Sequence, residues 1–200
     1  MGRKNRRRRN NNEFSFRPQR ITFNRRKIFS GILHWFVLIL VAAILGYAFV
    51  TFGFQTVTVV GPSMSDTLQD GQVVIVNKFV YNFHDVERYD IIAYSQVGQN
   101  EYYEIKRVIG LPEETVKISD GDIYINGKRL DDVPFDDKIL TSGVATEEIT
   151  LDDNEYFVLG DNVNNSEDSR YTNVGNISES EILGKVVSIY KPKEQRGKIE

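Results

Sequence analysis

The chain has 200 residues, 40% of them hydrophobic, and a net charge of −3, which fits one compact domain with shorter appendages. It has no cysteine, so disulfides, thiol catalysis and thiolate metal sites are excluded. Its two histidines are His34 and His84, and His34 lies in an apolar run, so a zinc site of two or three histidines is excluded outside that run. We expect neither a metal nor another cofactor.

The charge is unevenly distributed along the chain. Residues 1–27 hold eleven Lys or Arg and one acid, Glu13, so this arm carries +10 and the rest of the chain carries −13. Such an arm binds either nucleic acid or anionic lipid. Most of residues 1–19 is rich in Asn and Arg and poor in apolar residues, so we expect it to be disordered.

Residues 28–54 contain no Asp, Glu, Lys or Arg and are long enough to cross a hydrocarbon core of about 30 Å. We expect one transmembrane helix, with the basic arm in the cytoplasm and residues 55–200 outside. A cleaved signal peptide is the alternative, but the run is too long for one and no small-x-small site follows it. A buried soluble helix would need more surrounding core than the chain offers.

A short strand and a serine follow this run. In the expected strand, Val57 and Val59 point to one face and Thr58 to the other, and Gly61-Pro62 ends it. Ser63 comes next, where a hydroxyl can stand clear of a sheet. Such a serine is a candidate nucleophile, and the alternative is that it only decorates a turn.

The rest of the chain is mostly β in pattern. In residues 101–110, Lys106 shares a face with Glu104 and Val108 inside an apolar strand, which is unusual for lysine. Asn126-Gly127 is a strong signal for a type I′ hairpin. The other expected elements are strands at 71–80, 90–95, 155–159 and 181–190, a loop-rich acidic stretch at 131–153 and a frayed tail from residue 191. Residues 160–170 form a long polar loop with two acids and an Arg that could pair internally, and a plain surface loop is the alternative.

A serine nucleophile in this chain needs a base that is not cysteine. A Ser-His-Asp triad would have to use His84, and a neutral lysine amine is the other option. Burial disfavours the charged ammonium form of a lysine. Lys106 lies between Ile105 and Val108, so its surroundings suit that role, although only the fold can bring it to Ser63.

Several stretches, in this order, resemble the type I signal peptidases, in the short form typical of Gram-positive bacteria. The resemblance covers roughly residues 28–190, and the apolar anchor precedes the motifs as it does in that family. The matching stretches are SMSDTL at 63–68, NKF at 77–79, KRVIGLP at 106–112, and GDN at 160–162 followed by SEDSR at 166–170.

The resemblance implies a mainly β fold. It consists of an antiparallel β catalytic domain over residues 55–200, with a small β insertion at about 113–153, as in signal peptidases and SOS repressors. One transmembrane helix at 28–54 and a cytoplasmic arm at 1–27 precede it. The implied activity is removal of signal peptides from exported preproteins at the outer face of the bacterial cytoplasmic membrane. The implied partners are signal peptides and membrane lipid, with no nucleic acid.

The resemblance also implies the site. Ser63 is the nucleophile, Lys106 the general base, and Ser166 the serine that orients the lysine. The oxyanion is held by the Ser63 backbone N–H. Some relatives have a second donor, a serine hydroxyl two residues earlier, but here that position is Gly61. Asp161 with Arg107, and Asp168 with Arg170, hold the last loop against the dyad. The shallow apolar pockets, which favour small residues at the first and third positions before the cut, are lined by Val57, Val59, Met64, Leu68 and Ile105.

Three positions depart from the family pattern. Asp66 stands where Pro is usual, Glu113-Glu114 replaces Gly-Asp, and Val163 stands where Arg is common. A carboxylate at position 66 would favour the lysine ammonium if it came near Lys106. No dyad member is lost, so we expect an active enzyme with an atypical pH optimum or a narrow substrate set.

Three other functions compete with this interpretation. One is a self-cleaving Ser-Lys protein like the SOS repressors, which the anchor and the basic arm disfavour. Another is a non-catalytic assembly factor for surface structures built on a peptidase-like fold, for which Asp66 is the best support. The last is a basic arm that acts on nucleic acid or ribosomes, which predicts salt-sensitive RNA binding by residues 1–19.

Overall fold

A computed structural model describes residues 25–95, 102–135 and 137–199, with only the backbone for residues 25–28. The chain divides into two units, Met1–Leu45 and Gly46–Glu200. Residues 1–24 of the basic arm lie outside the described residues, so the disorder and lipid affinity expected for the arm stay predictions.

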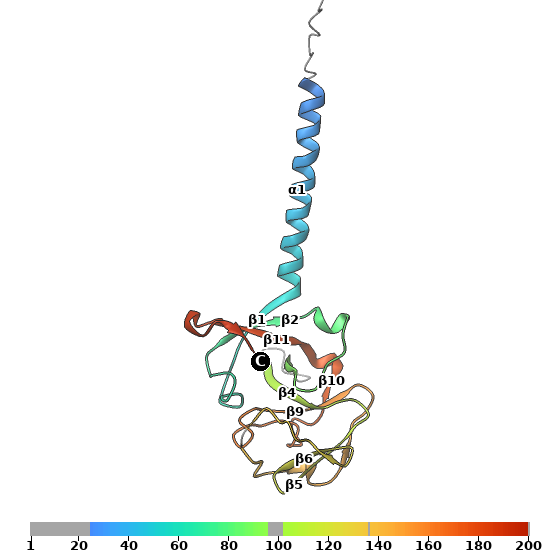
Figure 1. The fold of residues 1–200 in the computed structure, drawn as a ribbon, viewed down its shortest axis with the longest axis vertical. Coiled ribbons are helices and arrows are strands. Elements are labelled where there is room, and N and C mark those ends of the chain that lie inside the picture. The colour runs from blue at the N-terminus through green and yellow to red at the C-terminus, as the bar shows by residue number, and fades with distance from the viewer. Residues whose placement is uncertain (1–24, 96–101, 136, 200) are drawn as a thin grey trace, which may run out of the picture. The chain divides into compact units, whose positions relative to one another are not determined.

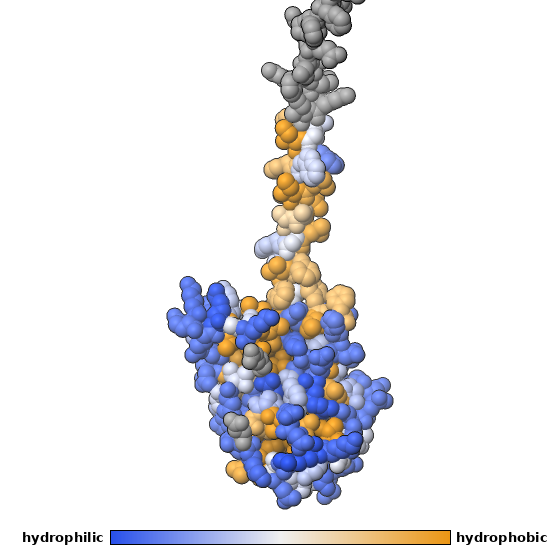
Figure 2. Space-filling model, in the orientation of Figure 1, coloured by the Kyte–Doolittle hydropathy of each residue, from blue (hydrophilic) through white to orange (hydrophobic). Residues whose placement is uncertain are grey.

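Helix α1 is Arg25–Gly53 and contains the predicted apolar run. Its segment Phe29–Gly53 is long and apolar enough to cross a membrane, and its side chains are almost all exposed. Figure 2 shows apolar side chains along this helix. An apolar surface of this kind suits lipid rather than water.

The larger sheet has strand order β1-β2-β11-β3-β4-β9-β10, with β12 paired to β11, and its pairings are antiparallel (Figure 1). Its strands are β1 Phe54–Thr58, β2 Val73–Asn77, β3 Ile91–Tyr94, β4 Glu104–Gly110, β9 Glu155–Leu159, β10 Ile177–Ser178, β11 Ile182–Lys191 and β12 Gly197–Lys198. Short 3-10 helices lie at Val80–Asn82, Gly143–Thr146, Glu179–Glu181 and Lys193–Gln195.

A second antiparallel sheet has strand order β7-β6-β5-β8. Its strands are β5 Thr115–Ser119, β6 Asp122–Ile125, β7 Lys128–Arg129 and β8 Ile149–Thr150, all within the stretch expected to be an insertion. The predicted hairpin is confirmed, because Asn126 and Gly127 both have positive φ, 51° and 72°, as a type I′ turn requires. The prediction of a mainly antiparallel β protein with a small second sheet and an apolar N-terminal helix is also confirmed.

The core explains which strands hold the site. Strand β2 alternates buried and half-buried residues, as a strand with one covered face does. Strands β3 and β4 are buried on both faces for nearly their whole length. Consecutive side chains of β4 therefore both point into the protein, and Lys106 and Arg107 are both buried.

Two predicted boundaries were wrong. The first strand begins directly after α1, at Phe54, because Phe54 pairs with Asn77 and satisfies its backbone groups there. The tail expected to be frayed instead turns back, so that β12 pairs with Ser188 and Ile189 of β11.

Candidate active site

Ser63 lies in the loop between β1 and β2, half-buried near the start of a tight turn. The turn opens at Gly61, whose φ of 81° is in the left-handed region that favours glycine. Further along, the Leu68 N–H donates to the Met64 carbonyl, and both side chains are buried in the core. These two anchors fix the turn that carries Ser63.

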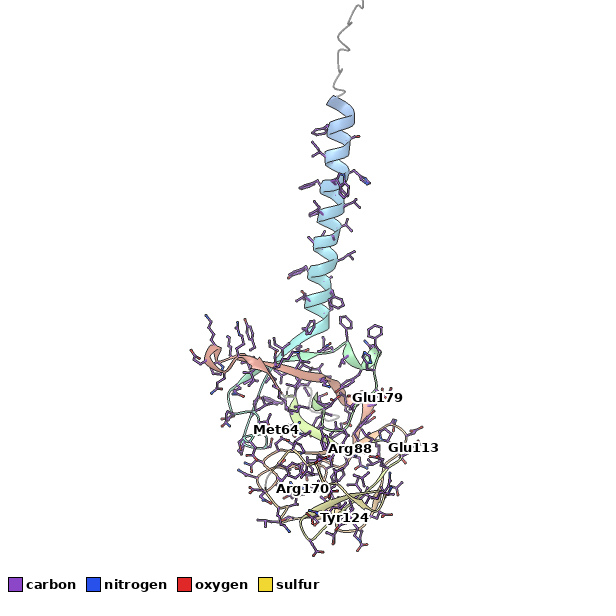
Figure 3. The ribbon with its side chains drawn as sticks, in the orientation of Figure 1. Met64, Arg88, Glu113, Tyr124, Arg170 and Glu179 are labelled. Carbon is purple, nitrogen blue, oxygen red and sulfur yellow. The ribbon has the colours of Figure 1, made fainter. Side chains whose placement is uncertain are left out.

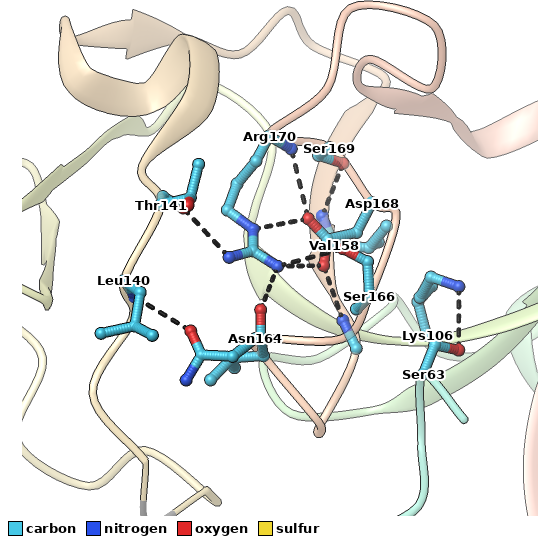
Figure 4. Close-up of polar contacts among 12 residues, drawn as sticks. Ser63, Lys106, Leu140, Thr141, Val158, Asn164, Ser166, Asp168, Ser169 and Arg170 are labelled. Atoms are coloured by element: carbon cyan, nitrogen blue, oxygen red, sulfur yellow. Dashed lines mark hydrogen bonds and ion pairs between the residues drawn. The ribbon is translucent and has the colours of Figure 1, made fainter.

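Lys106 lies on β4 opposite Ile92 of β3 and is only 4% exposed. Its Nζ donates to Ser63 Oγ at 3.2 Å, the contact drawn at the right of Figure 4. The same Nζ lies 3.1 Å from Glu104 Oε2. The structure therefore brings the predicted nucleophile and base within hydrogen-bond distance and adds a carboxylate beside the base.

Glu104 is itself held by a tyrosine. The buried Tyr94 hydroxyl donates to Glu104 Oε2 at 3.1 Å, and the two residues are register partners in β3 and β4. Burial, followed by the charge of Glu104, raises the pKa of Tyr94, so its hydroxyl keeps its proton. The Glu104 side chain is 39% exposed, so this carboxylate sits between the buried lysine and the solvent.

Ser166 is buried, and its Oγ has no hydrogen-bond partner among the residues that the structure describes. It lines the same groove as Ser63 and Lys106. Lys106 Nζ contacts Ser63 and Glu104 instead. The orienting role expected for Ser166 stays a prediction.

Arg107 and Asp161 form a closed pair on the opposite face of β4. Arg107 Nε and Nη2 donate to the two Asp161 carboxylate oxygens at 2.8 and 2.7 Å, and both side chains are buried. Arg107 Nη1 donates to the Tyr89 carbonyl at 3.0 Å, and the Thr67 hydroxyl donates to Asp161. The nucleophile loop, β4 and the loop after β9 are thereby tied together.

Arg170 and Asp168 form a second closed pair inside the loop after β9. Arg170 Nε and Nη2 each donate to an Asp168 carboxylate oxygen at 2.8 Å (Figure 4). Arg170 also donates to the backbone carbonyls of Thr141 and Val163. Both side chains are fully buried, so residues 160–170 form the internally paired loop rather than the plain surface loop that was its alternative.

Gly160 and Asn162 press this loop against the nucleophile loop. The Asn162 N–H donates to the Ser63 carbonyl at 3.0 Å, and its side-chain amide donates to Ser65 Oγ at 2.8 Å. A Cβ at position 160 would collide with the Ser63 carbonyl oxygen and with Ser166 Oγ. Glycine is therefore required at position 160 for this close approach.

A groove of about 680 Å³ surrounds the dyad. Three of the predicted pocket residues line it, namely Val59, Met64 and Ile105, whereas Val57 and Leu68 belong to the same core cluster but not to the lining. Its remaining lining residues are Val60, Gly61, Pro62, Ser63, Tyr102, Tyr103, Glu104, Lys106, Asn164, Asn165, Ser166, Glu167 and Tyr171.

One backbone edge of β4 borders this groove. Strand β9 pairs with β4 only from Arg107 onwards, whereas β3 pairs with all of Glu104 to Arg107. Within the described part of the chain, the β9 side of residues 104–106 therefore carries no paired strand. Such an edge is where an extended peptide adds to a sheet.

A family model described as signal peptidase, peptidase S26, matches residues 32–191. The chain belongs to the S26 signal peptidase family. Signal peptidase I of Bacillus caldolyticus is 36% identical over 172 residues, covering 80% of this chain and 90% of that protein. Signal peptidase I V of Bacillus subtilis (strain 168) is 37% identical over 163 residues, covering 75% and 94%. A solved signal peptidase I from Enterococcus faecalis V583 is 32% identical, covers 52% of this chain and 97% of its own, and gives a TM-score of 0.43.

The three departures from the signal peptidase pattern occupy different environments. Asp66 is exposed on the nucleophile loop, and the carboxylate that pairs with Lys106 is that of Glu104. Glu113 takes up a left-handed φ of 63° at an exposed position, the one where the family pattern has Gly. Val163 is buried in the core, and its carbonyl accepts from Arg170.

Two groups at the site were missed by the sequence analysis. Glu104 was placed on the same face as Lys106 without any role, and the signal available was its two-residue spacing on an apolar strand. Asn162 was noted only as part of a motif. Its contacts with the nucleophile loop cross about a hundred residues, and no local pattern reveals them.

Proposed function

We propose that this chain is a membrane-anchored signal peptidase I, a serine endopeptidase that uses Ser63 as nucleophile and Lys106 as base to cut signal peptides from exported preproteins. The observation that carries the assignment of residues is the 3.2 Å contact between Lys106 Nζ and Ser63 Oγ. The burial of Lys106 supports it, because a buried side chain holds its amine at a fixed place beside the nucleophile. Membership of the S26 family supports the substrate class.

In the proposed acylation step, Ser63 Oγ attacks the carbonyl carbon of the scissile peptide bond and its proton passes to the neutral Lys106 amine. The carbonyl oxygen becomes an oxyanion, held by the Ser63 backbone N–H. When the intermediate collapses, the C–N bond breaks and Lys106 gives its proton to the leaving amine. That amine is the new N-terminus of the mature protein, and the signal peptide remains as an ester on Ser63.

In the proposed deacylation step, a water molecule gives a proton to Lys106 and attacks the ester carbonyl. The ester C–O bond then breaks, and Ser63 Oγ recovers the proton from Lys106. The signal peptide leaves with a free carboxylate. One amine thus acts as base and acid in both halves of the reaction.

The proposed substrate lies as an extended strand in the groove. The free side of residues 104–106 offers backbone hydrogen bonds, and Val59, Met64 and Ile105 offer apolar contacts for alternate side chains. These three side chains are buried in the core and line the groove, and the proposed preference is for small residues at the first and third positions before the cut.

The apolar helix α1 and the bacterial signal peptidase relatives suggest a membrane anchor. In the proposed orientation, residues 1–27 lie in the cytoplasm because of their +10 charge, and the β unit faces outward. This places the cut at the outer face of the cytoplasmic membrane. The basic arm then contacts anionic lipid rather than nucleic acid.

The test is cleavage of a signal-peptide-bearing preprotein by the full chain purified in detergent. We expect Ser63→Ala and Lys106→Met each to reduce the rate by roughly 10³-fold or more. The matched control is Ser180→Ala, an exposed serine far along the chain, which should cleave like the parent. Cleavage that survives in Ser63→Ala contradicts the proposal, and no cleavage by the parent supports the non-catalytic assembly role instead.

A further inference from the structure

The carboxylate of Glu104 lies beside the Lys106 amine, the group that must be neutral to act as the base. Glu104 Oε2 is 3.1 Å from Lys106 Nζ, slightly closer than Ser63 Oγ at 3.2 Å. The two residues are two positions apart on β4, so their side chains share one face of the strand. The contact therefore joins the buried Lys106 to a partly exposed residue at the start of the same strand.

Tyr94 holds the Glu104 carboxylate in place through a hydrogen bond. The Tyr94 hydroxyl donates to the same oxygen, Oε2, that contacts Lys106. Tyr94 is fully buried on β3, directly opposite Glu104 in the sheet register. The carboxylate is thus held against the lysine by a donor that cannot move away.

The other charged groups near the dyad are turned to other partners. On the loop after β9, Asp161 is engaged by Arg107 and Asp168 by Arg170. Glu167 on the same loop lines the groove, is exposed and accepts from Asn173. Tyr103, on the segment just before β4, also lines the groove. On the loop after β1, the group that faces the amine is the uncharged hydroxyl of Ser63. Within the described residues, Glu104 is the carboxylate that pairs with Lys106.

We propose that Glu104 is a positioning residue that holds Lys106 as an ammonium ion in the resting enzyme and thereby moves the onset of cleavage to higher pH. The proposal rests on the proposed function, in which Lys106 accepts the Ser63 proton. A neighbouring carboxylate stabilises the ammonium form, and an ammonium has no lone pair with which to accept a proton. The enzyme then turns over only in the fraction of molecules whose Lys106 has lost its proton.

The pair also explains why Ser166 is left without a partner in the described part of the chain. Lys106 Nζ contacts Glu104 and Ser63, whereas the buried Ser166 Oγ in the same groove has no hydrogen-bond partner among the described residues.

The test compares the pH dependence of kcat/KM in the parent, Glu104→Gln and Asp66→Asn. Glutamine keeps an oxygen for Tyr94 and for Lys106 but removes the charge. We expect the rising limb in Glu104→Gln to move down by about one pH unit, so that the variant is about fivefold faster one unit below the parent's midpoint. The alkaline plateaus should agree.

Asp66→Asn is the matched control because it also removes one carboxylate, from the exposed side of the nucleophile loop. Its rising limb should coincide with that of the parent. A Glu104→Gln limb that stays at the parent's position, with only a lower plateau, would show a merely structural residue and would overturn the proposal. Tyr94→Phe should give a smaller shift in the same direction, since it loosens Glu104 without removing its charge.

A second measurement does not depend on cleavage. Lysine ¹³Cε chemical shifts of the full chain in detergent report the titration of Lys106, identified as the signal that is lost in Lys106→Met. We expect the Lys106 titration in Glu104→Gln to lie about one pH unit below that in the parent. If the parent cleaves nothing while this shift appears, the proposed function fails and the ion pair stands. If the two titrations coincide, the proposal is overturned whether or not the parent cleaves.

Discussion

Two neighbouring residues of β4, Lys106 and Arg107, form ion pairs of opposite character. Arg107 is bound through two parallel hydrogen bonds by Asp161, and both partners are buried. Lys106 has a single contact with Glu104, whose side chain is 39% exposed. A guanidinium stays charged at every accessible pH, whereas an amine can lose its proton. We infer that the buried Arg107–Asp161 pair stabilises the fold, whereas the partly exposed Lys106–Glu104 pair, the open pair, acts on the reaction.

The second closed pair follows the same rule. Arg170 lies inside the β unit in Figure 3, fully buried, with Asp168 and several backbone carbonyls as partners. The Arg107–Asp161 pair joins β4 to the loop after β9, and Arg170 ties that loop to the Thr141 carbonyl, so both pairs position the loops around the dyad without entering the chemistry.

Breaking the closed pair should unfold the protein rather than slow the reaction alone. In Asp161→Ala the buried Arg107 guanidinium keeps its charge but loses its carboxylate, which should lower the free energy of unfolding by about 3–5 kcal/mol. Glu104→Gln, which alters the partly exposed pair, should change it by less than about 1 kcal/mol. Denaturant unfolding of both variants measures the difference, and equal losses would remove the distinction between the pairs.

Displacing the dyad while both closed pairs remain intact is the second way to separate their roles. In Gly160→Ala the new methyl group collides with the Ser63 carbonyl and Ser166 Oγ, which pushes the nucleophile loop away from β4. A shift of this size should reduce kcat by roughly 10- to 100-fold. The thermal unfolding midpoint, measured alongside, should fall far less than in Asp161→Ala. Unchanged cleavage would show that the close approach has no bearing on catalysis.

Sequence patterns predicted the parts of this molecule that depend on short stretches. The hairpin at Asn126-Gly127 and the strand character of residues 73–77 both follow from neighbouring residues. The environment of Lys106 did not, because Tyr94 meets Glu104 only through the pairing of β3 with β4. The sequence analysis looked instead to Asp66, which is close to Ser63 in the chain but exposed in the structure.

The loop after β9 shows the same limit. Its residues are polar, so composition alone predicts a surface loop. The structure buries Asp161 and Asp168 because each meets an arginine that satisfies both carboxylate oxygens, while Asn164, Asn165 and Glu167 of the same loop stay exposed. Burial of polar side chains depends on partners, and partners are set by tertiary contacts.

Tyr94, which contacts Glu104, makes the folding stability fall at alkaline pH. Burial raises the pKa of Tyr94 and, together with Asp90, that of Tyr81. Both groups bind their protons more tightly when folded, so their contribution to stability is complete below about pH 10 and is lost as the pH rises above it. Between pH 8 and pH 11 the free energy of unfolding should therefore fall by about 1.4 kcal/mol less in Tyr94→Phe than in the parent. Unfolding measured at pH 8 and pH 11 tests this, and parallel losses in parent and variant would contradict it.

The smallest expected effect concerns strain beyond the end of β4. Glu113 adopts a φ of 63°, which costs a residue with a side chain roughly 1 kcal/mol relative to glycine. Glu113→Gly should therefore raise the free energy of unfolding by about that amount without changing the cleavage rate. Glu113→Ala is the matched control, because it removes the same carboxylate but keeps the strain. A gain in both variants would assign the effect to charge rather than to backbone conformation.

The central claim is that Ser63, activated by Lys106, forms an ester with the signal peptide. The most direct measurement mixes the full chain with a preprotein, quenches the reaction in acid and maps the acylated residue by mass spectrometry. The account predicts an acyl group on Ser63 whose mass corresponds to the signal peptide, and no acylation in Lys106→Met. Release of the mature protein with no acyl group on Ser63, at a rate unchanged in Ser63→Ala, would contradict the account.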